Sequence, residues 1–167
     1  MTADYLNADP RDEIVTFTPD AVPTLVVRVS DYPMNQMGTL FDDVFSNLAV
    51  ALAETGVTPV GAPFSLHTRM PTETSDFEVG VPVDAKASGV TVNGVEFIAS
   101  ELPSGNVATI SHIGPWDDLP EAWGAFMAGV AALGATPAFP FWEVYVTDPS
   151  STSDPMLYRT DLYTSLA

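Results

Sequence analysis

The alternation of apolar and polar positions predicts two consecutive units with the same order of elements. The first unit has expected strands at 25–30, 60–69 and 77–83, with a helix at 39–55 after the first strand. The second has strands at 107–112, 141–147 and 158–164, with a helix at 119–133. Shorter strands are expected at 14–18 and 95–102, and residues 1–12 are expected to form a loose polar tail.

A shift of 78 positions aligns the two units. It places Phe45 on Trp123 and Gly56 on Gly134, so that a whole helix and its exit turn stay in register. The repeat predicts one α+β domain over residues 1–167, built from a duplicated β-α-β-β motif. The two copies are expected at about residues 14–86 and 95–167.

Two units of this kind predict a curved, largely antiparallel sheet with both helices on one face. The other face is then expected to form a concave ligand groove. The helix stripes are expected to be core, because Leu and aromatic residues at helical spacing usually face a sheet. These stripes comprise Phe41, Val44, Phe45, Leu48 and Leu52 in the first helix, and Trp123 and Phe126 in the second.

One acidic residue stands in the middle of an aromatic strand of the second unit. Alternation places Phe141, Glu143 and Tyr145 on one face of this strand, and Trp142 and Val144 on the other. One interpretation is a solvated Glu on an open sheet face. The other is a carboxylate at the floor of an aromatic pocket, where desolvation makes its charge costly until a cation or donor arrives. The aromatic neighbours favour the pocket, with Glu143 on the helix-free face and Trp142 beneath the second helix.

The same shift maps Glu143 and Tyr145 onto Ser65 and His67 of the first unit. The acid is thus present once, and Ser65 and His67 are expected across the groove from it. Trp116, in the turn before the second helix, is placed to close one end of the groove. The ligand-binding candidates are therefore Glu143, Tyr145, Phe141, Trp116, Ser65 and His67, together with Tyr163 on the last strand.

Composition excludes several classes of function. Five Lys and Arg residues against 22 Asp and Glu give a net charge of −17, which repels nucleic acids and anionic membranes and favours cationic partners. The absence of Cys excludes disulfides and thiolate metal sites. His67 and His112 lack metal-binding spacing, and no phosphate or dinucleotide motif occurs, so we expect no metal and no cofactor. The N-terminus has no secretion signal and no apolar run is long enough to span a membrane, so we expect a cytoplasmic protein.

Four short runs resemble the bacterial GyrI-like small-molecule-binding domain, which is also the effector-binding domain of multidrug-responsive regulators of the AraC and MerR types. The runs are FEVGVPV at 77–83, LPSGNVA at 102–108, HIGPWDDLPEAW at 112–123 and WEVYVTDP at 142–149. The resemblance covers most of residues 14–165. It implies a concave face that binds lipophilic, often cationic aromatic molecules, with Glu143 as the polar anchor. Trp116 departs from the family, where Tyr is common at that position.

Three functions follow from the resemblance as hypotheses. The first is a multidrug-binding module that acts as a sensor or sequestering protein for a lipophilic cation. With 24 residues before Leu25, the chain lacks room for a helix-turn-helix, so a stand-alone form is expected. The second is a hydrolase that detoxifies reactive electrophiles, with Glu143 activating water and Tyr145 donating a proton. The third is a protein-interaction role like that of the gyrase inhibitor for which the family is named.

Overall fold

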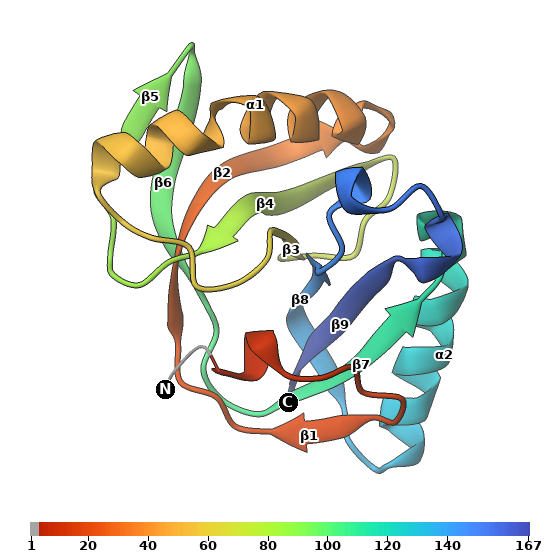
Figure 1. Ribbon diagram of the computed structural model, residues 1–167. Helices are drawn as coiled ribbons and strands as arrows, with labels where there is room; N and C mark the ends of the chain where they lie inside the picture. The colour runs from red at the N-terminus through yellow and green to blue at the C-terminus, as the bar shows by residue number, and fades with distance from the viewer. Residues whose placement is uncertain (1–3) are drawn as a thin grey trace.

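Residues 4–167 form a nine-stranded, curved antiparallel sheet with two α-helices (Figure 1). The computed structural model describes residues 4–167, apart from the side chain of Pro149. The strand order is β1-β7-β9-β8-β3-β4-β2-β6-β5. The strands are β1 (Val15–Phe17), β2 (Val22–Pro33), β3 (Phe64–His67), β4 (Thr74–Pro82), β5 (Val90–Val92), β6 (Val95–Leu102), β7 (Val107–Ile113), β8 (Pro137–Tyr145) and β9 (Arg159–Leu166).

The α+β class and the duplicated motif predicted from the sequence are confirmed. The first copy has the sheet order β2-β4-β3 and the second has β7-β9-β8, and the two copies meet where β3 pairs with β8. In that pairing Ser65 lies opposite Glu143, two positions that the repeat itself makes equivalent. The pseudo-twofold axis therefore passes through this pair, at the centre of the sheet.

Both helices lie on one face of the sheet, as predicted. Helix α1 (Met37–Thr55) packs on β2 and β4, and helix α2 (Leu119–Ala132) packs on β7 and β9. Directly paired residues of an antiparallel sheet point to the same face. The pairings give one row across this helix face, which consists of Val27, Val79, Ser65, Glu143, Leu162 and Ile110.

Helix α1 ends at Gly56, which has a φ of 75° in the left-handed region. Its amide nitrogen bonds to the carbonyl of Leu52 at 2.9 Å. Glycine adopts this conformation without the Cβ clash of other residues, which is the reason that the sequence predicts the stop correctly.

The concave face, opposite the helices, is filled by its own core, which corrects the prediction of a groove there. Val22 of β2 and Leu102 of β6 belong to the same buried cluster as Trp142 and Tyr163 from the other half, so the sheet curves toward this face. Leu6, 4% exposed, closes the cluster from the 3-10 helix η1 (Asp4–Asn7).

The expected loose tail is thus ordered from residue 4 onward, while residues 1–3 of that prediction lie outside the described part. Figure 1 shows η1 in front of the strands of the second half. Arg11 fixes the segment, since its guanidinium bonds to the carbonyl of Tyr5 at 2.9 Å. The remaining short 3-10 helices are η2 (Met34–Gln36), η3 (Trp116–Asp118), η4 (Pro149–Ser151) and η5 (Pro155–Leu157).

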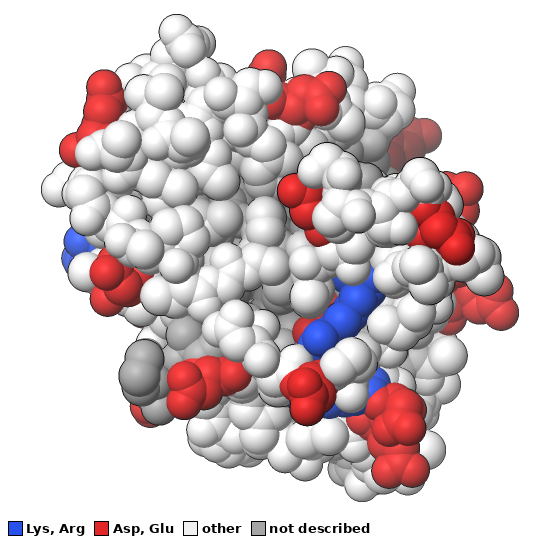
Figure 2. All heavy atoms as spheres, viewed as in Figure 1, with Lys and Arg blue, Asp and Glu red and all other residues white. Residues whose placement is uncertain are grey.

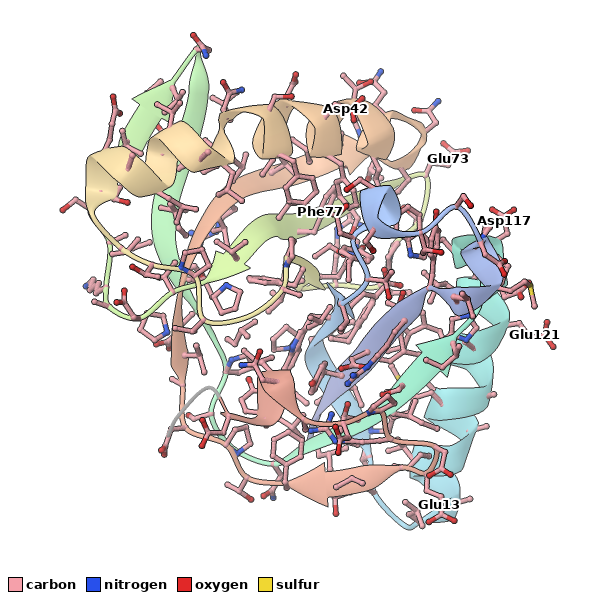
Figure 3. All side chains as sticks on the ribbon, viewed as in Figure 1. Glu13, Asp42, Glu73, Phe77, Asp117 and Glu121 are labelled. Atoms are coloured by element: carbon pink, nitrogen blue, oxygen red, sulfur yellow. The ribbon has the colours of Figure 1, made fainter. Side chains whose placement is uncertain are left out.

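Acidic side chains are spread over the surface in separate groups, with few basic ones among them (Figure 2). Glu13, Glu73, Asp117 and Glu121 lie at the periphery and point outward, whereas Phe77 lies inside, beneath α1 (Figure 3). None of the helices described in residues 4–167 is long and apolar enough to cross a membrane.

Candidate functional site: a cavity between the helices

A cavity of about 910 Å³ opens on the helix face of the sheet, between α1 and the turn that precedes α2. Its floor includes Glu143 and Tyr145 of β8, and Trp116 borders it. Its charged lining consists of Glu143, Asp42 and Asp148, and no Lys, Arg or His of the described chain is part of it. The volume lies in the range of small-molecule sites.

Glu143 occupies the helix face, not the helix-free face that we expected. The indole Nε1 of Trp123, on α2, donates to Glu143 Oε1 at 2.6 Å. The parity of the strand is as predicted, because Phe141, Glu143 and Tyr145 share one side and Trp142 packs on the other. Alternation fixes which residues face together but not which face the helices cover, so the assignment of the two faces was inverted.

The carboxylate of Glu143 is held by neutral donors alone. Tyr145 Oη donates to Glu143 Oε2 at 2.8 Å, and Ser65 Oγ lies 2.8 Å from Tyr145 Oη. With the phenol hydrogen directed to the carboxylate, Ser65 donates to Tyr145. In the described part of the chain, no basic side chain forms an ion pair with Glu143.

Burial and the adjacent charge of Glu143 raise the pKa of Tyr145 well above its usual range. The phenol therefore keeps its proton at neutral pH and remains a donor to the carboxylate. The result is a partly buried carboxylate whose two oxygens are oriented by an indole and a phenol, while its negative charge has no counter-ion from the protein.

The orientation of α1 opens the cavity. Its buried residues are Leu40, Val44 and Ala51, whereas Phe41 and Phe45 face the cavity, with Phe45 38% exposed. Leu48 and Leu52 also line it. Of the stripe predicted as core, Val44 is buried, Phe41, Leu48 and Leu52 pack against the core and also line the cavity, and Phe45 is a cavity wall. Leu40 corresponds to Asp118 in the second unit, which is an exposed carboxylate, and α2 instead buries Leu119, Phe126 and Val130.

Trp116 borders this cavity on the helix face and contacts two tyrosines. Its ring centroid is 6.0 Å from that of Tyr145 and 5.1 Å from that of Tyr158.

Ser65 is fully buried on the strand beside Glu143 and supports Tyr145 instead of facing the acid across a groove.

Three other predicted residues lie outside the cavity. His67 and Phe141 stack on each other on the far side of Glu143, with ring centroids 5.3 Å apart. Tyr163 is on the concave face, where it is fully buried and stacks on Trp142 at 5.2 Å. Its place corrects the prediction, because Tyr163 pairs with Trp142 and therefore faces away from Glu143.

Sequence reasoning missed Phe41, Phe45 and Trp123 as site residues, because each was assigned to the core. A usable signal was the width of the apolar surface of α1. Both the Leu40, Val44 and Ala51 side and the neighbouring Phe41 and Phe45 side are apolar. One helix face on a sheet needs only one such stripe.

The burial of His67 predicts a specific pH dependence of stability. Its ring lies between Phe77 and Phe141, and its Nδ1 is 2.9 Å from Ser75 Oγ. Burial, with a smaller contribution from Arg69, lowers the pKa of His67 to about 4. In the unfolded chain His67 takes up a proton below the ordinary histidine pKa of 6.5. In the folded protein its pKa is about 4, so it stays neutral until the pH falls to that value. Stability therefore falls by about 3 kcal/mol as the pH falls through this window.

This prediction is checked by urea unfolding of the protein and of His67→Gln across that window. Carboxylates titrate in both proteins, so the informative quantity is the difference between the two stability curves. We expect the loss toward acid pH to be smaller in the variant by about 3 kcal/mol. Parallel curves would show that His67 is not held neutral by the fold.

A known family matches most of the chain. The model of the GyrI-like small molecule binding domain matches residues 29–167, which is most of the sequence. The chain belongs to the GyrI-like family. A search of curated proteins found no match.

Solved structures with the GyrI-like fold resemble the whole chain at low sequence identity. The C-terminal domain of EcmrR has a TM-score of 0.76 and 17% identity, over 93% of this chain and 97% of that domain. SAV2435 bound to tetraphenylphosphonium has a TM-score of 0.66 and 9% identity, over 93% and 94%. A hydrolase from Listeria innocua has a TM-score of 0.64 and 11% identity, over 98% and 96%.

Proposed function

We propose that the cavity between the helices binds lipophilic organic cations, and that the protein acts as a sensor or a sequestering protein for them. The observation that carries the proposal is Glu143, whose two oxygens accept from Trp123 and Tyr145 while its charge lacks a protein counter-ion. A bound cation supplies that counter-charge.

The walls of the cavity suit the apolar part of such a ligand. Phe41 and Tyr145 contact each other with ring centroids 5.8 Å apart, and Phe45 and Trp116 are both partly exposed beside them. A cation over an aromatic face gains about 0.5–2 kcal/mol, and the gain tolerates many ring systems. The cavity thus favours ligands by charge first and by shape second.

The neighbour SAV2435, bound to tetraphenylphosphonium, supports this ligand class by analogy of fold. The acidic surface supports it as well, because a net charge of −17 raises the local concentration of cations. EcmrR, whose C-terminal domain resembles this chain, has also been solved in a complex with DNA, which supports the sensor role by the same analogy.

The test compares a planar cation with a neutral molecule of nearly the same shape, 10-methylacridinium and acridine, at a mildly basic pH where acridine is uncharged. Titration calorimetry is expected to give an affinity for the cation that is higher by about tenfold or more. Equal affinities, or no binding of either, would contradict the proposal.

Hydrolysis is a second candidate function, which one contact favours. Tyr145 Oη and Glu143 Oε2 lie 2.8 Å apart, so that an acid and a phenol reach the same point of the cavity floor. The Listeria innocua hydrolase of the same fold is consistent with this chemistry. Mass spectrometry of epoxides incubated with the protein distinguishes the two functions, since an enzyme forms many equivalents of hydrated product and a binding protein forms none.

A further inference from the structure

The pseudo-twofold axis relates the cavity to a second position on the other side of Glu143. The axis passes through the pairing of β3 with β8 at Glu143, so each residue that lines the cavity has a counterpart beyond it. The counterpart of Phe45 is Trp123, and the counterpart of Pro63 is Phe141. In a perfectly symmetrical protein the groove would have two equal halves, one beside α1 and one beside α2. In this protein the half beside α1 is the open cavity.

The half beside α2 is filled by side chains. The ring centroid of Trp123 lies 5.0 Å from Phe141 and 5.6 Å from Phe126, and His67 stacks on Phe141. Phe126 is buried and Trp123 is partly buried, whereas their counterparts in the open half, Leu48 and Phe45, are partly buried and exposed, respectively. Equivalent helix positions therefore close one half of the groove and leave the other open.

Trp123 also reaches the axis itself. Its Nε1 donates to Glu143 Oε1 at 2.6 Å, while Glu143 Oε2 accepts from Tyr145, which lines the open half. The indole thus fills the space beside α2 and at the same time holds one oxygen of the carboxylate. Phe45, at the equivalent position of α1, has no donor for this contact.

We propose that Trp123 sets the upper size of the ligand, because its indole occupies the half of the groove that would otherwise accept a second aromatic group. The proposal rests on the function proposed above. An apolar cavity of roughly 150 Å³ is enough to hold benzene, and an indole that is removed from a packed site leaves a space of that order. Trp123→Ala is therefore expected to extend the cavity across the axis without changing the walls beside α1.

The first test asks whether the second half exists as a separate space. Thermal unfolding of Trp123→Ala is measured with added indole and with indene, a hydrocarbon of the same shape that lacks the N–H group. Indole is expected to raise the melting temperature of the variant, and indene to raise it less because it cannot donate to Glu143. The unmodified protein, whose half beside α2 is filled by Trp123, should respond less to indole than the variant does. This readout does not require binding of a cation, and an unchanged melting temperature of the variant in indole would overturn the proposal.

The second test measures size selection directly. The probes are tetraphenylphosphonium and a phosphonium in which one phenyl group is replaced by biphenylyl, titrated by calorimetry. The unmodified protein should prefer the smaller cation, and Trp123→Ala should shift the ratio of the two affinities toward the larger one by at least about tenfold. Trp123→Phe retains a ring in the space and should keep the original ratio.

Phe45→Ala is the matched control, because Phe45 is the counterpart of Trp123 in the open half. Its loss should weaken both cations and leave the ratio unchanged. If the cations bind and the ratio is the same in Trp123→Ala as in the unmodified protein, the proposed role of Trp123 is wrong. If no cation binds to any of these proteins, the proposed function fails, while the indole measurement still decides whether the second half exists.

Discussion

Replacing Trp142 with Ala is expected to lower the free energy of unfolding by about 3–5 kcal/mol, which is a large share of the stability of a typical domain. Trp142 is fully buried on the concave face, where its ring stacks on Tyr163 at an interplanar angle of 5°. The sheet curves around this ring, so the space left by its removal cannot close without moving strands from both halves.

Urea denaturation followed by far-ultraviolet circular dichroism measures this loss without relying on the removed fluorophore. Trp142→Phe is the informative companion, since the Nε1 of Trp142 has no hydrogen-bond partner in the described structure. The variant keeps most of the ring and removes an unpaired buried donor, so it should cost less than Trp142→Ala. Val50→Ala, at a helix position that is 48% exposed, should change stability by less than about 0.5 kcal/mol.

A loss below about 1 kcal/mol for Trp142→Ala would contradict the filled concave face. It would mean that this side of the sheet is open, as the sequence alone had predicted.

Replacing Glu143 with Gln is expected to weaken the binding of a lipophilic cation by about tenfold or more, with little change for a neutral molecule of the same shape. At 4 Å a cation gains only about 1 kcal/mol from a carboxylate in water, but about 4 kcal/mol at an effective dielectric constant near 20. Glu143 is partly buried and is oriented by Trp123 and Tyr145. The free energy that a cation gains beside it should therefore lie between these two values.

Asp42→Asn is the matched control for net charge. Asp42 also lines the cavity and its loss removes the same single charge, but its side chain lies on the outer, exposed side of α1 (Figure 3). Solvent screens such a charge, so the affinity for the cation should fall by no more than about threefold. Equal losses for cationic and neutral ligands in Glu143→Gln would show that Glu143 acts through structure and not through its charge.

The local features of the fold follow from the sequence. The 78-residue repeat predicted two copies of one motif, and alternation predicted that Glu143 and Tyr145 share a face away from Trp142. The glycine that follows α1 was identified as well, because its missing Cβ favours the left-handed conformation at that point. These features follow from the linear pattern of residue types and need no information on which distant segments contact each other.

The location of the site was decided by the tertiary structure. Alternation gives the same pattern whichever face the helices cover, and the direction in which the sheet curves depends on contacts between β2, β6 and the strands of the second half. The side chain of Leu6 adds to that choice, since it closes the concave face from a segment that the sequence predicts to be loose.

The asymmetry of the two halves also arises only in three dimensions. Phe45 and Trp123 occupy equivalent positions in equivalent helices, yet Phe45 lines a cavity and Trp123 fills one. The difference comes from how each helix rotates over the sheet, and that rotation is set by the residues of the neighbouring stripe. Leu40 is buried beneath α1, whereas the equivalent Asp118 is exposed, and α2 buries Leu119, Phe126 and Val130 instead. A repeat in the sequence therefore specifies two similar motifs, and the packing of each helix decides which of them carries the binding site.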